Sequence, residues 1–183
     1  MNVRFAKPAA DAAQIVEIYN YYIETSHATF ETETLDSGEM EKRIRAIGEN
    51  YPYLVAEEET GGEILGYAYA TKYKERAAYR HSTEVSVYVK NDLKQRGIGS
   101  LLYQKLFAAL ARKPGIHAVI AGISLPNEAS VRLHEKFGFE KVAHFREVGF
   151  KFGRWIDVGY WEMIKNDYPR KNTKETRKRV SRE

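Results

Sequence analysis

The sequence predicts one mixed α/β sheet flanked by helices. Short alternating apolar runs recur along the 183 residues, segments with a helical spacing of apolar residues lie between them, and glycine-containing turns join paired runs. No internal repeat or linker interrupts this order. The length is sufficient for one substantial core. We therefore expect one domain, residues 1–164, followed by a basic and flexible tail, residues 165–183.

Each element is expected from a local pattern. The expected strands are residues 3–6, 53–57, 64–72, 83–89, 117–123, 141–152 and 155–163. The expected helices are residues 11–25, 39–47, 98–111 and a segment that starts at Pro126-Asn127-Glu128. Asp36 or Ser37 and Asn127 are suitable N-caps, and Gly138 is suitable just beyond a helix C-terminus. Thr60-Gly61-Gly62 marks a hairpin turn.

A glycine turn, Gly97-Ile-Gly99, follows the strand at 83–89 and opens the helix at 98–111. It is either a phosphate-binding turn at a helix N-terminus or a plain strand-to-helix connection. A dinucleotide fingerprint needs Gly or Ala where Leu102 stands, and an acidic residue where an apolar strand follows. A P-loop needs a lysine between its last glycine and the serine that follows, and Ser100 follows Gly99 directly. Both of these nucleotide-binding classes are therefore excluded.

The net charge of +4 comes from the tail, residues 165–183. Residues 165–183 hold eight Lys or Arg and three acidic residues, a charge of +5, so residues 1–164 carry −1. The tail is either a solvated extension or a nucleic-acid contact. The body lacks the interleaved basic and aromatic pattern of an RNA-binding sheet, so we do not expect a nucleic-acid partner.

Other classes are excluded by composition. The sequence has no cysteine, which rules out disulfides, thiolate metal sites and any cysteine-linked covalent intermediate. No His, Asp and Glu residues have metal-ligand spacing, so we expect no metal. The N-terminus has no long apolar run, and no segment approaches the roughly 18 apolar residues of a membrane span. We expect a cytoplasmic protein without a membrane partner.

The element order and the turn Lys94-Gln-Arg-Gly97-Ile-Gly99 resemble the GNAT superfamily of N-acetyltransferases, whose pattern is Gln/Arg-x-x-Gly-x-Gly/Ala. Lys94 departs from it. Within the superfamily the chain resembles the phosphinothricin and methionine sulfoximine (or sulfone) acetyltransferases, over residues 2–164. The segments that carry this likeness are residues 18–25, 30–33, 79–89, 126–134 and 149–159. It implies a GNAT fold, with a mostly antiparallel sheet of about seven strands and about four helices.

The resemblance implies that acetyl-CoA is the cofactor. Its pyrophosphate is expected on the turn and the first helical amides: Gln95, Arg96, Gly97, Ile98, Gly99 and Ser100. Its pantetheine arm and thioester carbonyl are expected along the backbone of Val87, Tyr88 and Val89, with a further contact from Asn127. The side chains of Val87 and Val89 can still belong to the core.

The resemblance also implies the catalytic groups. Glu84 is expected to be the general base, directly or through a water, and a carboxylate there would also hold the incoming ammonium group. His134 and Tyr88 are expected as further proton-transfer groups. The alternatives are an exposed strand glutamate at position 84 and a packed or surface histidine at position 134.

On the substrate side, Arg80 is expected to bind an α-carboxylate and Phe30 to form a wall of the side-chain pocket. Arg80 could instead be a surface cation and Phe30 an ordinary core residue. The predicted activity is acetyl transfer to the α-amine of a small amino acid, such as phosphinothricin, methionine sulfoximine or methionine sulfone, by direct attack in a ternary complex. The alternatives are acetylation of a polyamine or a protein N-terminus, and a non-catalytic CoA- or nucleic-acid-binding module. The resemblance implies a homodimer, with Phe145, Phe150, Phe152 and Trp155 at its interface.

Overall fold

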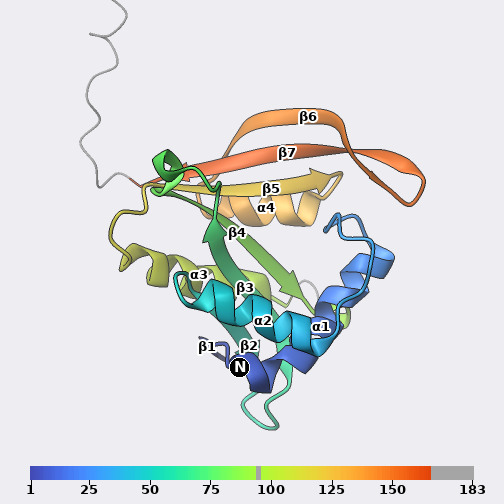
Figure 1. Cartoon of the computed structure of the whole chain (residues 1–183), viewed down its shortest axis with the longest axis vertical. Coiled ribbons are helices and arrows are strands. Elements are labelled where there is room, and N and C mark those ends of the chain that lie inside the picture. The colour runs from blue at the N-terminus through green and yellow to red at the C-terminus, as the bar shows by residue number, and fades with distance from the viewer. Residues whose placement is uncertain (94–95, 166–183) are drawn as a thin grey trace, which may run out of the picture.

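The protein is described by a computed structural model, which covers residues 1–93 and 96–165 (Figure 1). The strands are β1 (Asn2–Phe5), β2 (Tyr53–Glu57), β3 (Ile64–Lys72), β4 (Ser82–Val89), β5 (Ala118–Leu125), β6 (Glu140–Lys151) and β7 (Arg154–Ile164). The helices are α1 (Pro8–Thr25), α2 (Ser37–Gly48), α3 (Ile98–Ala111) and α4 (Glu128–Lys136). This confirms the predicted fold class.

The strands form one sheet in the order β1-β2-β3-β4-β5-β7-β6. All neighbouring pairs are antiparallel except β4 and β5, which are parallel. The last described strand, β7, lies between β5 and β6 in the interior of the sheet.

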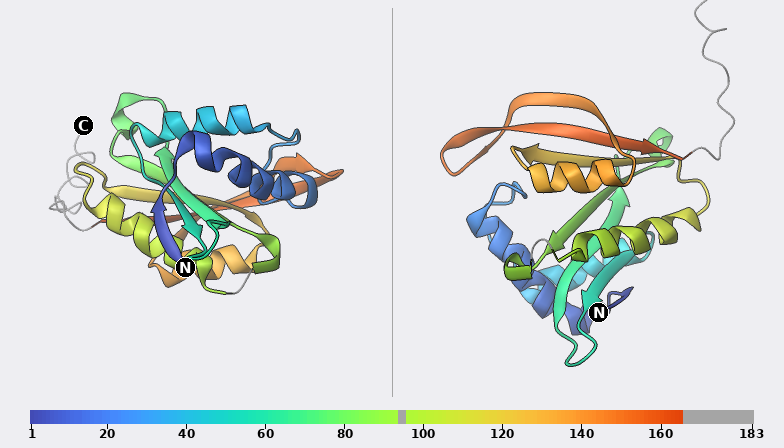
Figure 2. Two further views of the ribbon diagram at one scale, coloured as in Figure 1. Left: turned by 90° about the horizontal axis from the view of Figure 1, so that it is seen from below. Right: turned by 180° about the vertical axis from the view of Figure 1, so that it is seen from behind.

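Helices cover both faces of the sheet, with α1 and α2 on one side and α3 and α4 on the other (Figure 2, left). On the α3 side, Leu102, Tyr103 and Leu106 are fully buried against the sheet. On the α1 side, Ile15 and Ile44 belong to a second core with residues of β2 and β3. Two apolar layers therefore hold the sheet between the helix pairs.

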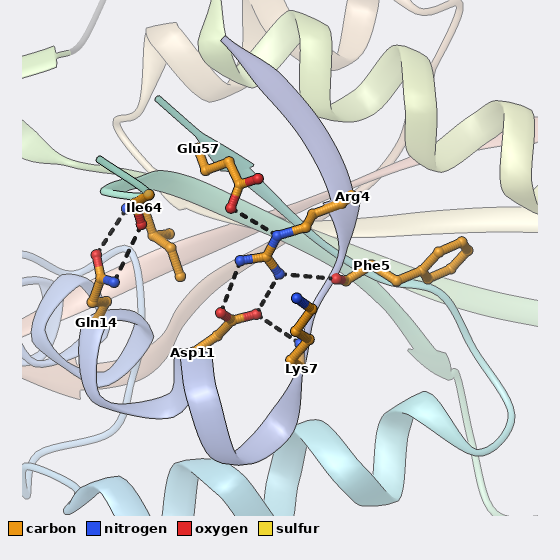
Figure 3. Close-up of polar contacts among 8 residues, drawn as sticks. Arg4, Phe5, Lys7, Asp11, Gln14, Glu57 and Ile64 are labelled. Atoms are coloured by element: carbon orange, nitrogen blue, oxygen red, sulfur yellow. Dashed lines mark hydrogen bonds and ion pairs between the residues drawn. The ribbon is translucent and has the colours of Figure 1, made fainter. Parts of the chain in front are cut away.

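An ion-pair network joins β1 to α1 and β2 (Figure 3). The Arg4 guanidinium contacts both oxygens of Asp11, at 2.7 and 2.9 Å, and its Nε contacts Glu57 at 2.7 Å. Asp11 also accepts a hydrogen bond from the backbone N–H of Lys7 at 2.6 Å. Burial raises the pKa of Asp11, but these bonds outweigh it and bring the pKa below its ordinary value. The network stabilises the ionised form of a buried carboxylate.

Local signals explain most boundaries. Asp36 caps α2, where its Oδ1 accepts the Glu39 N–H at 2.7 Å, and Asn127 caps α4 through the Ser130 N–H at 3.2 Å. Helix α1 begins at Pro8, three residues before the predicted start, because proline suits the first helical turn. Of the predicted tail, only Lys165 lies within the described residues. Among the described helices, none is long and apolar enough to cross a membrane.

Candidate active site

An opening between β4 and β5 lies at the centre of the sheet. The two strands pair only from Ser82 to Glu84 on β4 and from Ala118 to Ile120 on β5. Beyond these residues both strands continue, and their ribbons diverge (Figure 1). In a gap of this kind the backbone groups of the two strands are not hydrogen-bonded to one another. An extended ligand arm can therefore bind there as an added strand.

The glycine turn precedes α3, where the sequence placed it. Gly97 has a φ of +79°, a left-handed conformation that favours glycine, and it immediately precedes α3. A Cβ on Gly99 would lie 3.3 Å from the Leu133 side chain, so this glycine permits α3 to pack closely. Among the residues that the structure describes, no side chain caps the start of α3, which leaves its first amides available to an anion.

The residues predicted to hold pyrophosphate differ in their surroundings. Ile98 is buried, so it can offer only its backbone, whereas Arg96 and Gly97 are exposed. Gln95 lies outside the described residues. The Lys136 ammonium from α4 donates to Ser100 Oγ at 3.1 Å. The sequence analysis missed Lys136 because only the fold brings the end of α4 to the start of α3.

A pocket of about 790 Å³ adjoins the β4–β5 opening. It lies over β5, β6 and β7, and the loop after α1 closes one side of it. Its polar and ionisable lining residues are Thr29, Tyr73, Lys74, Glu84, Ser124, Tyr160 and Glu162. Its apolar lining includes Phe30, Phe145, Phe150 and Val158. Apolar walls with a few polar groups are typical of a small-molecule site.

Glu84 projects into this pocket from the last paired position of β4. Burial raises the pKa of Glu84, and the positive charge of Lys74 partly opposes this effect. Its Oε1 would lie 3.4 Å from a Cβ on Gly122, so the carboxylate lies over the bare backbone of β5. Among the described residues, Glu84 has no ion-pair partner within bonding distance. An isolated carboxylate with a raised pKa is suited to accept a proton.

Phe30 forms a wall of the pocket, as predicted. Its ring packs directly on Gly149 of β6, where a Cβ would lie only 2.1 Å from the ring. Lys151, which is buried, donates to the carbonyls of Ser26 and Thr29 at 2.8 and 2.9 Å. The loop that carries Phe30 is therefore fixed to the β6–β7 hairpin. The sequence analysis missed Lys151 and Gly149 because their partners are more than 100 residues away.

Arg80 lies outside this pocket. It is exposed at the end of the 3₁₀ turn Ala77–Tyr79, and its guanidinium is 3.4 Å from the Ala77 carbonyl oxygen. Lys74 is instead the basic side chain that lines the pocket beside Glu84. The sequence signal for Lys74 was only a lysine just after β3.

His134 and Tyr88 are packed inside the protein. His134 is buried, with Nε2 at 2.8 Å from the Tyr103 hydroxyl and Nδ1 at 2.8 Å from the Ser130 carbonyl oxygen. Burial lowers its pKa. Tyr88 stacks on Tyr67 at a ring-centroid distance of 5.3 Å, and burial raises its pKa. Neither residue lines the pocket that contains Glu84.

Asn127 and the two valines also have structural partners. Asn127 Oδ1 caps α4, and the residue lines a second cavity, of about 620 Å³, beside Trp155. Val87 and Val89 pack against the core on the α3 side, which leaves their backbone for a ligand. No group of three or more His, Asp or Glu within the described ranges is placed to hold a metal ion.

The chain matches the description "Acetyltransferase (GNAT) domain" over residues 4–159. It belongs to the GNAT acetyltransferase family. The predicted resemblance is thereby confirmed, and with it an acetyl-CoA-dependent transferase activity. The divergent β4 and β5 strands and the uncapped start of α3 fit this cofactor.

Named relatives of the chain lie within the family. It is 44% identical over 154 residues to a phosphinothricin N-acetyltransferase of Streptomyces coelicolor, covering 83% of this chain and 90% of the relative. It is 37% identical over 166 residues to an L-methionine sulfoximine/L-methionine sulfone acetyltransferase of Salmonella typhimurium, covering 89% and 94%. A solved Salmonella typhimurium acetyltransferase structure with acetyl-CoA superposes with a TM-score of 0.87 at 35% identity, covering 92% of this chain and 96% of that one.

Proposed function

We propose that this enzyme acetylates the α-amine of a small amino acid with a polar tetrahedral side-chain head, such as phosphinothricin, methionine sulfoximine or methionine sulfone. The observation that carries the proposal is the position of Glu84, a partly buried carboxylate inside the 790 Å³ pocket and beside the β4–β5 opening. The names of the relatives support the same substrate class.

In this proposal each pocket residue has a separate role. Glu84 binds the substrate ammonium group and takes its proton, directly or through a water, because only the free amine is nucleophilic. Lys74 binds the α-carboxylate, with Arg80 as the alternative cation. Phe30 encloses the side chain and excludes water. Bound acetyl-CoA would supply the acetyl group as a thioester. In a ternary complex the free amine would form the amide bond directly while the carbon–sulfur bond breaks and CoA leaves as its thiolate.

The cofactor is held by backbone in this proposal. The amides from Arg96 to Ser100 and of Gln95 hold the pyrophosphate, and Lys136 adds a positive charge beside Ser100. The exposed edge of β4 from Val87 to Val89 holds the pantetheine arm. The assignments of Asn127 to the cofactor, and of His134 and Tyr88 to proton transfer, stay predictions. Their packed positions make Glu84 the better supported proton-transfer group.

A thioester-consumption assay tests the proposal. We expect turnover with methionine sulfone, methionine sulfoximine or phosphinothricin, and little with polyamines, because Lys74 repels a second cation in the pocket. Turnover with polyamines alone would contradict it.

We further propose a cytoplasmic homodimer with residues 1–164 as its catalytic domain. The β6–β7 hairpin exposes large apolar side chains, which a second copy would cover: Val142, Phe145, Val148, Phe150, Phe152 and Trp155. Analytical ultracentrifugation would show a dimer, and Phe150→Asp would give a monomer. Deletion of residues 167–183 is expected to leave kcat unchanged, and cell fractionation tests the location.

A further inference from the structure

A buried serine on β5 is coupled to a histidine from the loop after α1. Ser124 is only 6% exposed and lines the pocket that contains Glu84. Its Oγ lies 3.0 Å from Nδ1 of His27. The two residues are 97 positions apart in the sequence, so the pair exists only because the loop docks on the sheet. Neither residue has a role in the proton transfer or cofactor binding described above.

The pair lies at a defined distance from the proposed base. Glu84 is in register with Ile120, and its carboxylate lies over Gly122. Ser124 is the next residue of β5 on the same face, about 6.6 Å further along the strand. A substrate whose amine contacts Glu84 and whose side chain runs along β5 therefore brings its side-chain head to Ser124.

The surroundings of the pair favour an oxygen atom as its ligand. Burial lowers the pKa of His27, and the nearby positive charges of Arg154 and Lys151 lower it further. A neutral imidazole that carries its proton on Nδ1 donates to Ser124 Oγ, which leaves the serine hydroxyl free to donate into the pocket. Arg154 and Lys151 are also close enough to His27 to attract a negative oxygen bound beside it. Both effects suit a partially or fully negative oxygen.

The loop is held on both sides of His27. Lys151 donates to the carbonyl of Ser26, just before it, and to the carbonyl of Thr29, two residues after it. Ser26 Oγ also accepts the Ala28 N–H at 3.1 Å. The position of the imidazole is thus fixed before a substrate binds, which reduces the entropic cost of binding.

We propose that Ser124 and His27 form the subsite that binds the oxygen-bearing head of the acceptor side chain. The pair therefore determines the preference of the enzyme for a sulfone, sulfoximine or phosphinate over a thioether. This inference rests on the proposed function, because it assumes an amino-acid acceptor with its amine at Glu84.

Two acceptors that differ only at the side-chain sulfur test the inference. The side-chain sulfur of methionine sulfone carries two oxygens, whereas the sulfur of methionine carries none. The measured quantity is the ratio of kcat/KM for the sulfone to kcat/KM for methionine. Ser124→Ala and His27→Ala are each expected to lower this ratio about tenfold, the effect of one lost hydrogen bond in a buried site. The double variant is expected to lower it no more than the stronger single variant, because the two residues act as a unit.

Control variants separate this role from general damage. His27→Asn keeps a polar atom near the Nδ1 position and is expected to restore most of the ratio. Thr25→Ala removes a hydroxyl at the exposed end of α1, outside the pocket, and is expected to leave the ratio unchanged. An unaltered ratio in Ser124→Ala and His27→Ala, or an equal loss with both acceptors, overturns the inference and leaves the proposed function standing. Failure of the unmodified enzyme to acetylate any amino acid overturns both.

Discussion

Two carboxylates of this protein, the buried Asp11 and the partly buried Glu84, have opposite surroundings. Asp11 is enclosed by the Arg4 guanidinium and the Lys7 N–H, and its pKa lies below the ordinary value. Glu84 faces the pocket without an ion-pair partner among the described residues, and burial raises its pKa although the charge of Lys74 opposes this. The surroundings of Asp11 stabilise its ionised form, so this residue contributes to the fold. The surroundings of Glu84 destabilise its ionised form, so this carboxylate is available for chemistry. The difference shows that the number of partners, more than burial, separates a structural carboxylate from a catalytic one.

The largest expected effect is the loss of the proposed base. Glu84→Gln is expected to lower kcat by about 10²–10⁴-fold, because an amide cannot accept the amine proton. Acetyl-CoA affinity, measured by calorimetric titration, is expected to stay within about twofold because the cofactor is held by backbone. Glu140→Gln makes the same change on β6 outside the pocket and serves as the control. An unchanged kcat in Glu84→Gln would remove Glu84 from the mechanism.

Loss of the partner of Asp11 is expected to lower stability and leave catalysis unchanged. Arg4→Leu leaves Asp11 buried without its counter-charge and is expected to lower the free energy of unfolding by about 3–5 kcal/mol, measured by urea denaturation. The kcat of the remaining folded enzyme should not change. Arg45→Leu breaks an exposed pair with Glu41 and should cost only about 0.5 kcal/mol. Equal losses of stability in the two variants would show that the Arg4 network contributes no more than an exposed ion pair.

The third effect concerns Lys74, whose charge opposes the pKa shift of Glu84. Lys74→Ala is expected to raise the amino-acid KM about tenfold if Lys74 binds the carboxylate, with a smaller change in Arg80→Ala. The reverse order would assign the carboxylate to Arg80.

The pH profile gives a second measurement of the same charge. Catalysis needs ionised Glu84, so kcat/KM is expected to fall about tenfold per pH unit below its pKa. Since burial raises this pKa above 4.5, the fall begins at a higher pH than for an ordinary glutamate. Lys74→Ala should move it to a still higher pH. The stability contributed by Asp11, whose pKa is lowered, is present above the ordinary pKa and is lost only as pH falls through the lowered value. A profile that does not shift in Lys74→Ala would contradict the coupling.

The smallest effect is on stability at the active site. A raised pKa in the folded state means that ionised Glu84 costs stability at neutral pH. Glu84→Gln removes that charge and is expected to increase the free energy of unfolding by on the order of 1 kcal/mol. A thermal melt at neutral pH checks this. A lower melting temperature would show that Glu84 has stabilising partners in solution.

The sequence predicted features that depend on neighbours in the chain. Alternating and helical spacings, with cap residues for α4, predicted the seven described strands and the four described α-helices, and the glycines at 97 and 99 predicted a turn that opens α3. Position 84 was predicted through the family resemblance, and the structure places Glu84 inside the pocket. These features are encoded within a few residues of where they occur.

The sequence could not predict contacts made by the tertiary fold. The sequence analysis named Arg80 and not Lys74, because a lysine and an arginine six residues apart look equivalent in the sequence. In the fold, Lys74 lines the pocket just after β3, whereas the 3₁₀ turn leaves Arg80 exposed outside it. His134 was expected to transfer a proton, but the fold buries it against Tyr103, a partner 31 residues away. The buried Lys151 and the His27–Ser124 pair each join the start of the chain to its last third.

The placement of β7 between β5 and β6 has a consequence for synthesis of the protein. Helices α1 to α3 and strands β1 to β4 can form as the chain leaves the ribosome, and they contain the glycine turn and Glu84. The last segment, β6 and β7, supplies one wall of the pocket and the Lys151 anchor for the loop after α1. It also supplies β7, the central strand of the β5–β7–β6 group. A nascent or truncated chain that ends before β6 would therefore lack the β6–β7 walls of the proposed acceptor pocket.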